Sequence, residues 1–195
     1  PWLALFTLIA AAGAIMLWTV EPNTAFIIHA LFWIALANFA FEMGMVFYNA
    51  MLPDLAPPEK LGRWSGWGWG LGYIGGLICL GITLVAFVQA DVPLFGLDKS
   101  AAEELRITGP FVAAWMVAFA LPLFLLTPDK NATGKTISAA IHDGLSSLAR
   151  TFSQLQNYKG VGRFLLARMI YTDGLNTLFA FGGIYAAGTF NLTFE

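Results

Sequence analysis

The sequence predicts an all-α membrane protein with five transmembrane helices and a cytoplasmic amphipathic helix. Of the 195 residues, 58% are hydrophobic and only 11% are charged, and the mean hydropathy is +0.70. A soluble domain carries about 25% charged residues, so this chain lacks the charge to cover a surface that faces water. Strict alternation of apolar and polar residues is absent, and the apolar runs are too long for the strands of a membrane barrel.

Five apolar runs come close to or exceed the roughly 20 residues that a helix needs to cross the hydrocarbon. They cover Trp2–Val20, Thr24–Met51, Ser65–Gln89, Gly109–Thr127 and Val161–Phe190. Their first partner is therefore the lipid bilayer. Because the chain starts at Pro1 and stops soon after another apolar run, we expect a fragment whose remaining helices belong to the same polypeptide.

The distribution of basic residues predicts which connections face the cytoplasm. Alternate connections divide into two sets, and cytoplasmic loops carry the excess of lysine and arginine. One set holds seven basic residues, namely Lys60, Arg63, Lys130, Lys135, Arg150, Lys159 and Arg163, whereas the other holds two, Lys99 and Arg106. The Pro-rich loop near residue 57 and the long connection 128–160 are therefore predicted to be cytoplasmic.

The stretch Asn49–Gly76 is predicted to be a tight, charged loop followed by a packing helix. Gly68, Gly72 and Gly76 recur every four residues, a spacing that lets helix backbones approach closely in lipid. The same stretch satisfies GxGxxG, but a dinucleotide site needs a preceding strand and an accessible helix N-terminus. We therefore reject a nucleotide site here.

The connection 128–160 contains apolar residues at spacings of three and four, typical of one face of an amphipathic helix. These residues are Ile137, Ile141, Leu145, Leu148, Phe152 and Leu155. The helix is expected on the membrane surface or against the cytoplasmic ends of the bundle, either as a packed surface helix or with a regulatory or partner-binding role. In the other long loop, Ser100 and Glu103 fit a capping box, which predicts one or two helical turns.

Polar residues within the second run share one helical face. Asn38, Glu42, Met45 and Asn49 follow at offsets of four, three and four. A carboxylate at the centre of a bilayer costs roughly 2.5 to 3.5 kcal/mol on insertion scales, so this face is expected to point into the bundle. It either lines a substrate or proton pathway, or forms a polar clamp between helices.

The fifth run carries a second polar cluster. Arg168, Thr172 and Asn176 recur every four residues, and Asp173 stands among them. Arg168 either joins the pathway or extends to the cytoplasmic interface, as long basic side chains do near helix ends. Asp173 lies deeper and is expected to contact substrate or protons, or else to pair with a charge on another helix.

Catalytic and metal chemistry has no support in the sequence. The two histidines, His29 and His142, and the single cysteine, Cys79, are widely separated, so no zinc site is expected. No nucleophile stands with a base, and no cofactor is implied. The net charge of −2 gives no indication of nucleic-acid binding, and a lone cysteine allows no intrachain disulfide.

Two segments resemble a known family. FYNAMLPDLAPPEKLGRWSGWGWGLGYIGG and FLLARMIYTDGLNTLFAFGGIYA resemble the major facilitator superfamily, and within it the branch related to the vacuolar amino-acid effluxers of autophagy. Members have two halves of six helices. The resemblance covers nearly the whole chain and implies that the five runs are helices three to seven. It divides the chain into four helices of the N-terminal half (1–127), the connection between the halves (128–160) and the first helix of the C-terminal half (161–195).

The resemblance also implies roles for charged residues. In this superfamily the first helix of each three-helix repeat lines the central cavity, and here these are the helices that carry Glu42, Arg168 and Asp173. Asp54 and Arg63 resemble the residues that latch cytoplasmic helix ends in one state of the transport cycle. Tyr73 departs from the pattern, since it stands where the glycine-rich motif of drug antiporters has a proline, and this argues against a drug exporter.

From these features we expect part of a secondary active transporter that moves a small solute by alternating access. The resemblance implies an amino acid as substrate, and the membrane depth of Glu42 and Asp173 suggests proton coupling. The expected location is the bacterial plasma (inner) membrane, as an integral multi-pass protein. The alternatives are a non-transporting membrane scaffold or assembly subunit and an intramembrane enzyme.

Overall fold

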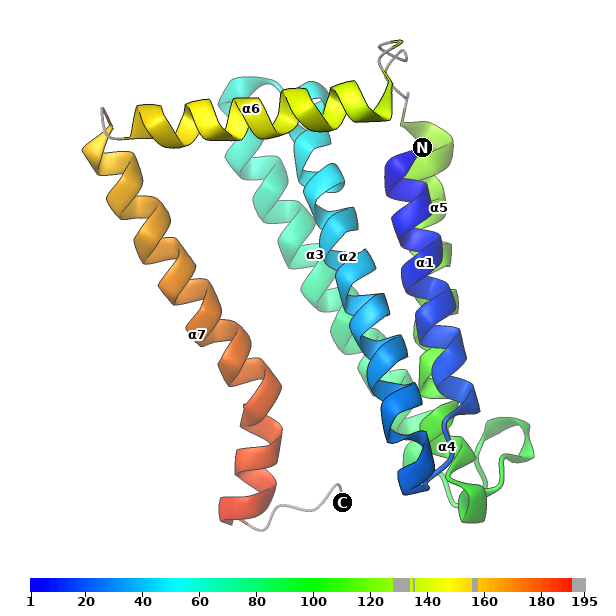
Figure 1. Cartoon of the computed structure of the whole chain (residues 1–195). Coiled ribbons are helices and arrows are strands. Elements are labelled where there is room, and N and C mark those ends of the chain that lie inside the picture. The colour runs from blue at the N-terminus through cyan, green and yellow to red at the C-terminus, as the bar shows by residue number, and fades with distance from the viewer. Residues whose placement is uncertain (128–133, 135, 156–157, 191–195) are drawn as a thin grey trace. The chain divides into compact units, whose positions relative to one another are not determined.

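The computed structural model describes residues 1–127, 134, 136–155 and 158–190 (Figure 1). The chain divides into two compact units, Pro1–Asp129 and Lys130–Glu195, which are treated separately below. In the described residues, every regular element is a helix, which confirms the all-α prediction. The long helices are α1 (Trp2–Met16), α2 (Ile27–Leu55), α3 (Leu61–Thr83), α5 (Thr108–Leu126), α6 (Ile137–Leu155) and α7 (Lys159–Phe190).

Among the described residues, four helical segments are long and apolar enough to cross a membrane, and they coincide with the first four predicted runs. They cover Trp2–Thr19, Thr24–Leu55, Pro58–Val88 and Glu103–Leu126. The chain is therefore an integral membrane protein. Helix α7 has 32 residues, which is long enough, but its polar residues lower its mean hydropathy and it is not among the four. The fifth span thus stays a prediction.

Helix α1 forms the core of the first unit by packing against both α2 and α5 (Figure 1). At Gly13 a Cβ atom would lie 2.9 Å from the Cβ of Ala37 on α2, and at Gly109 of α5 it would lie under 3.0 Å from the carbonyl oxygen of Ala14. Both glycines therefore permit backbone approaches that no larger residue allows. Aromatic stacking adds to the α1–α2 contact, since the rings of Phe6 and Phe47 lie 5.7 Å apart.

The predicted charged loop is shorter than the sequence suggested. Helix α2 continues through Pro53 to Leu55, a 3₁₀ turn covers Pro58–Lys60, and α3 begins at Leu61. Pro53 has no N–H to donate to the carbonyl oxygen four residues before it, and the helix continues for only two more residues. The loop itself is thus limited to a few residues, and the glycines that follow it belong to α3.

The end of α1 is held by an arginine from the helical turn α4 (Glu103–Arg106). The Arg106 side chain donates hydrogen bonds through Nε, at 2.8 Å, and through Nη2 to the carbonyl oxygen of Trp18. Its guanidinium also lies 5.1 Å from the centre of the Trp18 ring. A carbonyl at a helix C-terminus has no partner in its own helix, so Arg106 supplies one from a segment far along the chain.

The predicted capping box at Ser100 is wrong, although helical turns do form there. Asp98 caps a 3₁₀ turn, Lys99–Ala101, by accepting from the backbone N–H of Ser100 at 2.8 Å and from its hydroxyl at 2.7 Å. Glu103 accepts from the N–H of Asp98 instead of Ser100, at 2.9 Å. The two bonds from Ser100 lower the pKa of the Asp98 carboxyl from its usual value. The cap is thus Asp98, two residues before the predicted Ser100, because the Asp98 carboxylate is a good acceptor for the Ser100 N–H.

In the second unit, α6 leads into α7 with only three residues between them. The side chains of Ile141, Leu145, Leu148 and Phe152 on α6 are all exposed. They follow the spacing that predicted an amphipathic helix. The predicted stripe members Ile137 and Leu155 lie outside the described side chains.

Candidate functional site

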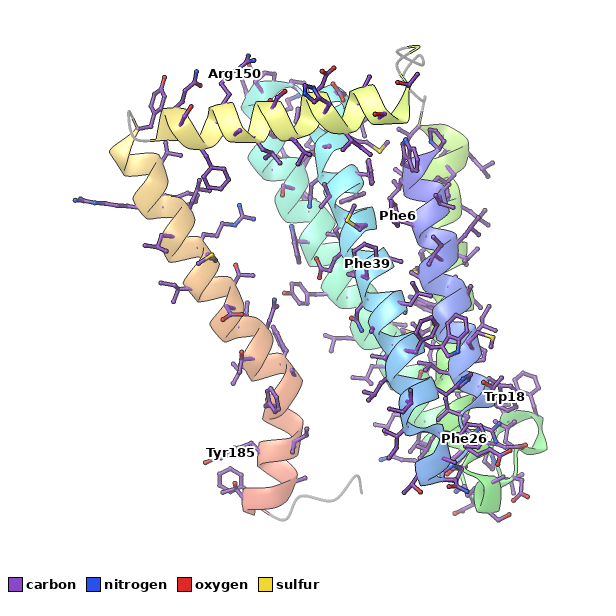
Figure 2. All side chains as sticks on the ribbon, in the orientation of Figure 1. Phe6, Trp18, Phe26, Phe39, Arg150 and Tyr185 are labelled. Carbon is purple, nitrogen blue, oxygen red and sulfur yellow. The ribbon has the colours of Figure 1, made fainter. Side chains whose placement is uncertain are left out.

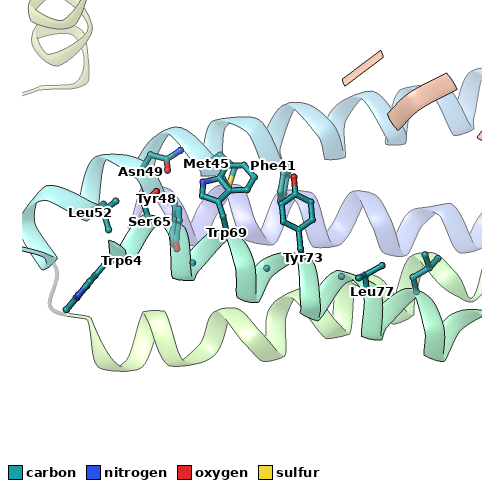
Figure 3. Close-up of a pocket in the computed structure, with 14 residues that line it drawn as sticks. Phe41, Met45, Tyr48, Asn49, Leu52, Trp64, Ser65, Trp69, Tyr73 and Leu77 are labelled. Atoms are coloured by element: carbon teal, nitrogen blue, oxygen red, sulfur yellow. The ribbon is translucent and has the colours of Figure 1, made fainter. Parts of the chain in front are cut away.

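The main concave surface of the first unit is an apolar and aromatic groove between α2 and α3, called here the α2–α3 groove (Figure 3). Its volume is about 500 Å³, within the usual size of small-molecule sites. The α2 side contributes Phe41, Met45, Tyr48, Asn49 and Leu52, and the α3 side contributes Trp64, Ser65, Gly68, Trp69, Gly72, Tyr73, Gly76, Leu77 and Leu80.

The glycines of α3 form the floor of this groove. A Cβ atom at Gly72 or Gly76 would meet no atom within 4 Å, and at Gly68 it would meet the Tyr48 hydroxyl at 3.4 Å. The rings of Trp69 and Tyr73 stand beside this floor with their centres 6.1 Å apart. In the described chain the glycine stripe is thus open, and its predicted packing against another helix stays a prediction.

The polar face predicted on α2 is divided by the structure. Met45 and Asn49 line the α2–α3 groove, whereas Asn38 and Glu42 do not. Both of these are exposed, and the Asn38 amide donates to the carbonyl oxygen of Ile34 at 2.9 Å, within its own helix. The four residues share a side of α2, but only the half nearest the α3 glycines joins a groove. Their role in a pathway stays a prediction.

A second space lies between α1, α2 and α5, with a volume of about 380 Å³. Phe41, Met45 and Tyr48 line this space as well as the α2–α3 groove. These three side chains therefore form the wall between two neighbouring spaces. A change of rotamer in any of them would alter the volume of both.

The polar cluster predicted on the fifth run comes together on α7. Arg168, Thr172, Asp173 and Asn176 line one shallow, open groove with Leu165, Met169 and Ile170, called here the α7 groove. All of these residues are exposed (Figure 2 draws the side chains). A guanidinium, a carboxylate, an amide and a hydroxyl are thus presented together, which provides both a cationic and an anionic group to a polar ligand.

The two predicted latch residues lie on opposite sides of the short turn between α2 and α3. Asp54 is in the last turn of α2, and Arg63 is in the first turn of α3. Arg63 lines a separate shallow groove on α3 with Gly62, Gly66 and Gly70 among others. The latch itself stays a prediction.

His29, the histidine within the second span, is held by polar and aromatic contacts. His29 shares a hydrogen bond of 2.8 Å with the Thr19 hydroxyl and meets the rings of Phe26 and Trp33 edge-on. In the part of the chain that the structure describes, no three of His, Cys, Asp or Glu lie close enough to hold a metal ion. His29 is thus a half-buried histidine held by a hydrogen bond and by contacts with aromatic rings.

Sequence reasoning missed the aromatic wall of the groove. Trp69, Tyr48 and Tyr73 were not among the predicted site residues. The signal that could have found them is their register, because Trp69 and Tyr73 are four residues apart and adjoin Gly68 and Gly72 along α3. Aromatic rings beside a row of glycines indicate a lined groove when no larger residue fills it.

Comparison with known proteins agrees with these features. Residues 59–194 match the family described as "Vacuole effluxer Atg22 like". The chain is also 27% identical over 166 residues to an uncharacterized MFS-type transporter, YxiO, of Bacillus subtilis (strain 168), covering 85% of this chain and 38% of that protein. The chain therefore spans well under half the length of this relative. No solved structure matches it. The match over residues 59–194 and the likeness to an MFS-type transporter confirm the resemblance to the major facilitator superfamily and show that the chain belongs to the Atg22-like effluxer family.

Proposed function

We propose that this chain is part of a secondary active transporter that moves a small solute across a membrane by alternating access. The family match over residues 59–194 carries the proposal. It covers α3 with its groove and the polar cluster of α7, the segments that would face a substrate. Family membership also favours a transporter over the intramembrane enzyme considered above.

An amino acid is the proposed substrate, by resemblance to the vacuolar amino-acid effluxers. The α7 groove supports this class, because it presents Arg168 and Asp173 together. A guanidinium suits a carboxylate and a carboxylate suits an ammonium group, and an amino acid carries one of each. Thr172 and Asn176 would supply the uncharged hydrogen bonds that fix its orientation.

Proton coupling is proposed to involve Glu42 of α2 and Asp173 of α7. Ionisable groups within membrane helices are costly and commonly belong to substrate or proton pathways. Both carboxylates are placed far from the ends of their helices. Asp54 and Arg63 are proposed to act as a latch at the cytoplasmic ends of α2 and α3. The bacterial plasma (inner) membrane is the proposed location, supported by the bacterial relative.

An exchange experiment with the full-length protein tests transport without assuming an energy source. Proteoliposomes are loaded with a mixture of unlabelled amino acids, and entry of each labelled amino acid is followed with no pH gradient. We expect exchange of one or a few amino acids above the level of protein-free vesicles. Absence of exchange for amino acids and for other small solutes would contradict the proposal and favour the scaffold or assembly subunit.

A further inference from the structure

The amphipathic helix α6 has an unpartnered apolar face within the second unit. Ile141, Leu145, Leu148 and Phe152 are between 58% and 72% exposed. Spacings of four, three and four place them on one face, called here the apolar stripe of α6. Large apolar side chains exposed in a row indicate a surface that contacts something other than water.

We propose that α6 lies in the interfacial layer of the bilayer with its apolar stripe inserted between lipids, and that lipid packing, not lipid charge, controls this attachment. The first support is the position of the helix in the chain. Only three residues separate Leu155 at the end of α6 from Lys159 at the start of α7. An extended chain covers at most about 3.6 Å per residue, so the end of α6 stays within roughly 15 Å of the start of α7.

The chain also connects α6 to a membrane span on its N-terminal side. Helix α5, which is apolar enough to span the membrane, ends at Leu126, eleven positions before α6 begins. Lys159 and Arg163 mark the start of α7, and basic residues accumulate at the cytoplasmic end of a span. A helix of 19 residues is about 28 Å long. Attached to α7 by three residues, α6 is in reach of the interface at which α7 is predicted to enter the membrane.

The composition of the polar face of α6 favours lipid packing over lipid charge as the property that controls attachment. Between Ile137 and Leu155 the helix contains one acidic residue, Asp143, and one basic residue, Arg150. The rest of the polar face is small or uncharged and consists of Ser138, His142, Ser146, Ser147, Thr151, Ser153 and Gln154. Helices that bind anionic lipids carry several lysines or arginines on this face. Here the two charges balance, so insertion of apolar side chains must supply the attachment.

Small polar residues also favour insertion where lipids are loosely packed. A face of serine and threonine gives little attraction to headgroups at any surface charge. Binding then requires gaps between lipids wide enough for Leu148 and Phe152. Such gaps are more frequent in curved membranes and in membranes of unsaturated lipids, and the binding of interfacial helices is known to depend on both. The bilayer is thus the occupant of the stripe, and its packing is the regulating variable.

The test uses the full-length protein with its other cysteines replaced, including Cys79→Ala. Leu145→Cys places an environment-sensitive fluorophore on the apolar stripe, and Ser146→Cys, one residue along, places it on the polar face as the matched control. Both proteins are reconstituted into phosphatidylcholine vesicles. Quenching by lipids with a nitroxide on the acyl chain and by iodide in the water is measured for each.

We expect lipid quenching to be several-fold stronger at position 145 than at position 146, with iodide quenching in the reverse order. Replacing part of the phosphatidylcholine with phosphatidylserine, or raising the salt concentration, should leave the lipid quenching unchanged. Smaller vesicles or unsaturated lipids should increase it. Equal iodide quenching at both positions would overturn the proposal, as would shielding of position 145 from both quenchers, which indicates docking on protein. Lipid quenching that rises with phosphatidylserine and falls with salt would also overturn it.

Discussion

Replacing Gly109 with alanine should separate α5 from α1 and destabilise the protein. A methyl group at this position would come closer than 3.0 Å to the carbonyl oxygen of Ala14, whereas ordinary contact begins at 3.4 Å. The two backbones would therefore have to move apart by more than 0.4 Å. Because the neighbour is backbone and not the end of a flexible side chain, the strain is not relieved by a rotamer change.

The magnitude follows from two opposing effects. Overpacking a close contact costs about 1 to 3 kcal/mol, and exchanging glycine for alanine in a helix gains up to about 1 kcal/mol. The net expected loss for Gly109→Ala is up to about 2 kcal/mol. At Gly81 of α3 a methyl group meets nothing within 4 Å, so Gly81→Ala is the matched control and should be neutral or stabilising.

The assay is thermal unfolding of the purified protein in one detergent, followed by tryptophan fluorescence. We expect Gly109→Ala to unfold at a lower temperature than the unchanged protein. Gly13→Ala should show a smaller shift, because its nearest neighbour, the Cβ of Ala37, lies at 2.9 Å and the contact at Gly109 is shorter than that. Equal stability of Gly109→Ala and Gly81→Ala would refute the close α1–α5 contact.

Three further outcomes are expected. Arg106→Lys should destabilise the end of α1 by about 1 kcal/mol or more, since lysine cannot reproduce the paired bonds to the carbonyl of Trp18. Unfolding by urea or detergent measures this loss, and an unchanged stability would contradict it. Arg63→Ala should alter the transport rate and the balance of conformations, and unchanged values of both would reject the latch. Hydrogen bonds from Ser100 lower the pKa of Asp98, so their stabilisation is present at neutral pH and is lost as the pH falls through that lowered value. The protection of the Ser100 amide from hydrogen exchange, relative to its intrinsic rate at each pH, should fall only there, and constant protection would contradict the cap.

The elements of the first unit follow closely from the apolar runs. Backbone polar groups must be satisfied internally in lipid, so a long apolar run leaves helix as the consistent structure. The turn at Pro57 was also predictable, but its length was not. Pro53 suggested an early helix end, and only the structure shows that a proline in the last turn is compatible with helix to Leu55.

Glycine packing shows why pattern and contact can differ. Gly68, Gly72 and Gly76 have the regular spacing, yet in the described chain they form an open floor. The close approaches occur at Gly13 and Gly109. Gly109 has a small partner four residues on, Ala113, which is 1% exposed. The Gly109–Ala113 pair could have predicted a close helix contact from the sequence. Gly13 has no small residue four positions away, and its contact depends on how α2 crosses α1.

The candidate site was predicted in part for the same reason. Arg168, Thr172, Asp173 and Asn176 line one groove, as their spacing predicts, because a single helix determines their relative positions. The α2–α3 groove depends on two helices and on the glycines between them. Sequence periodicity therefore identified Asn49 as polar and inward but not its aromatic neighbours.

Accumulation of the transported amino acid under an inward proton gradient tests the central claim most directly. The full-length protein and the variants Glu42→Gln and Asp173→Asn are compared in proteoliposomes, with Glu59→Gln in the turn between α2 and α3 as the matched control. The account predicts that Glu42→Gln loses accumulation but retains exchange, that Asp173→Asn loses accumulation and also weakens exchange because Asp173 is proposed to bind the substrate ammonium group, and that the control behaves as the unchanged protein. Full accumulation by both Glu42→Gln and Asp173→Asn would contradict coupling through these carboxylates.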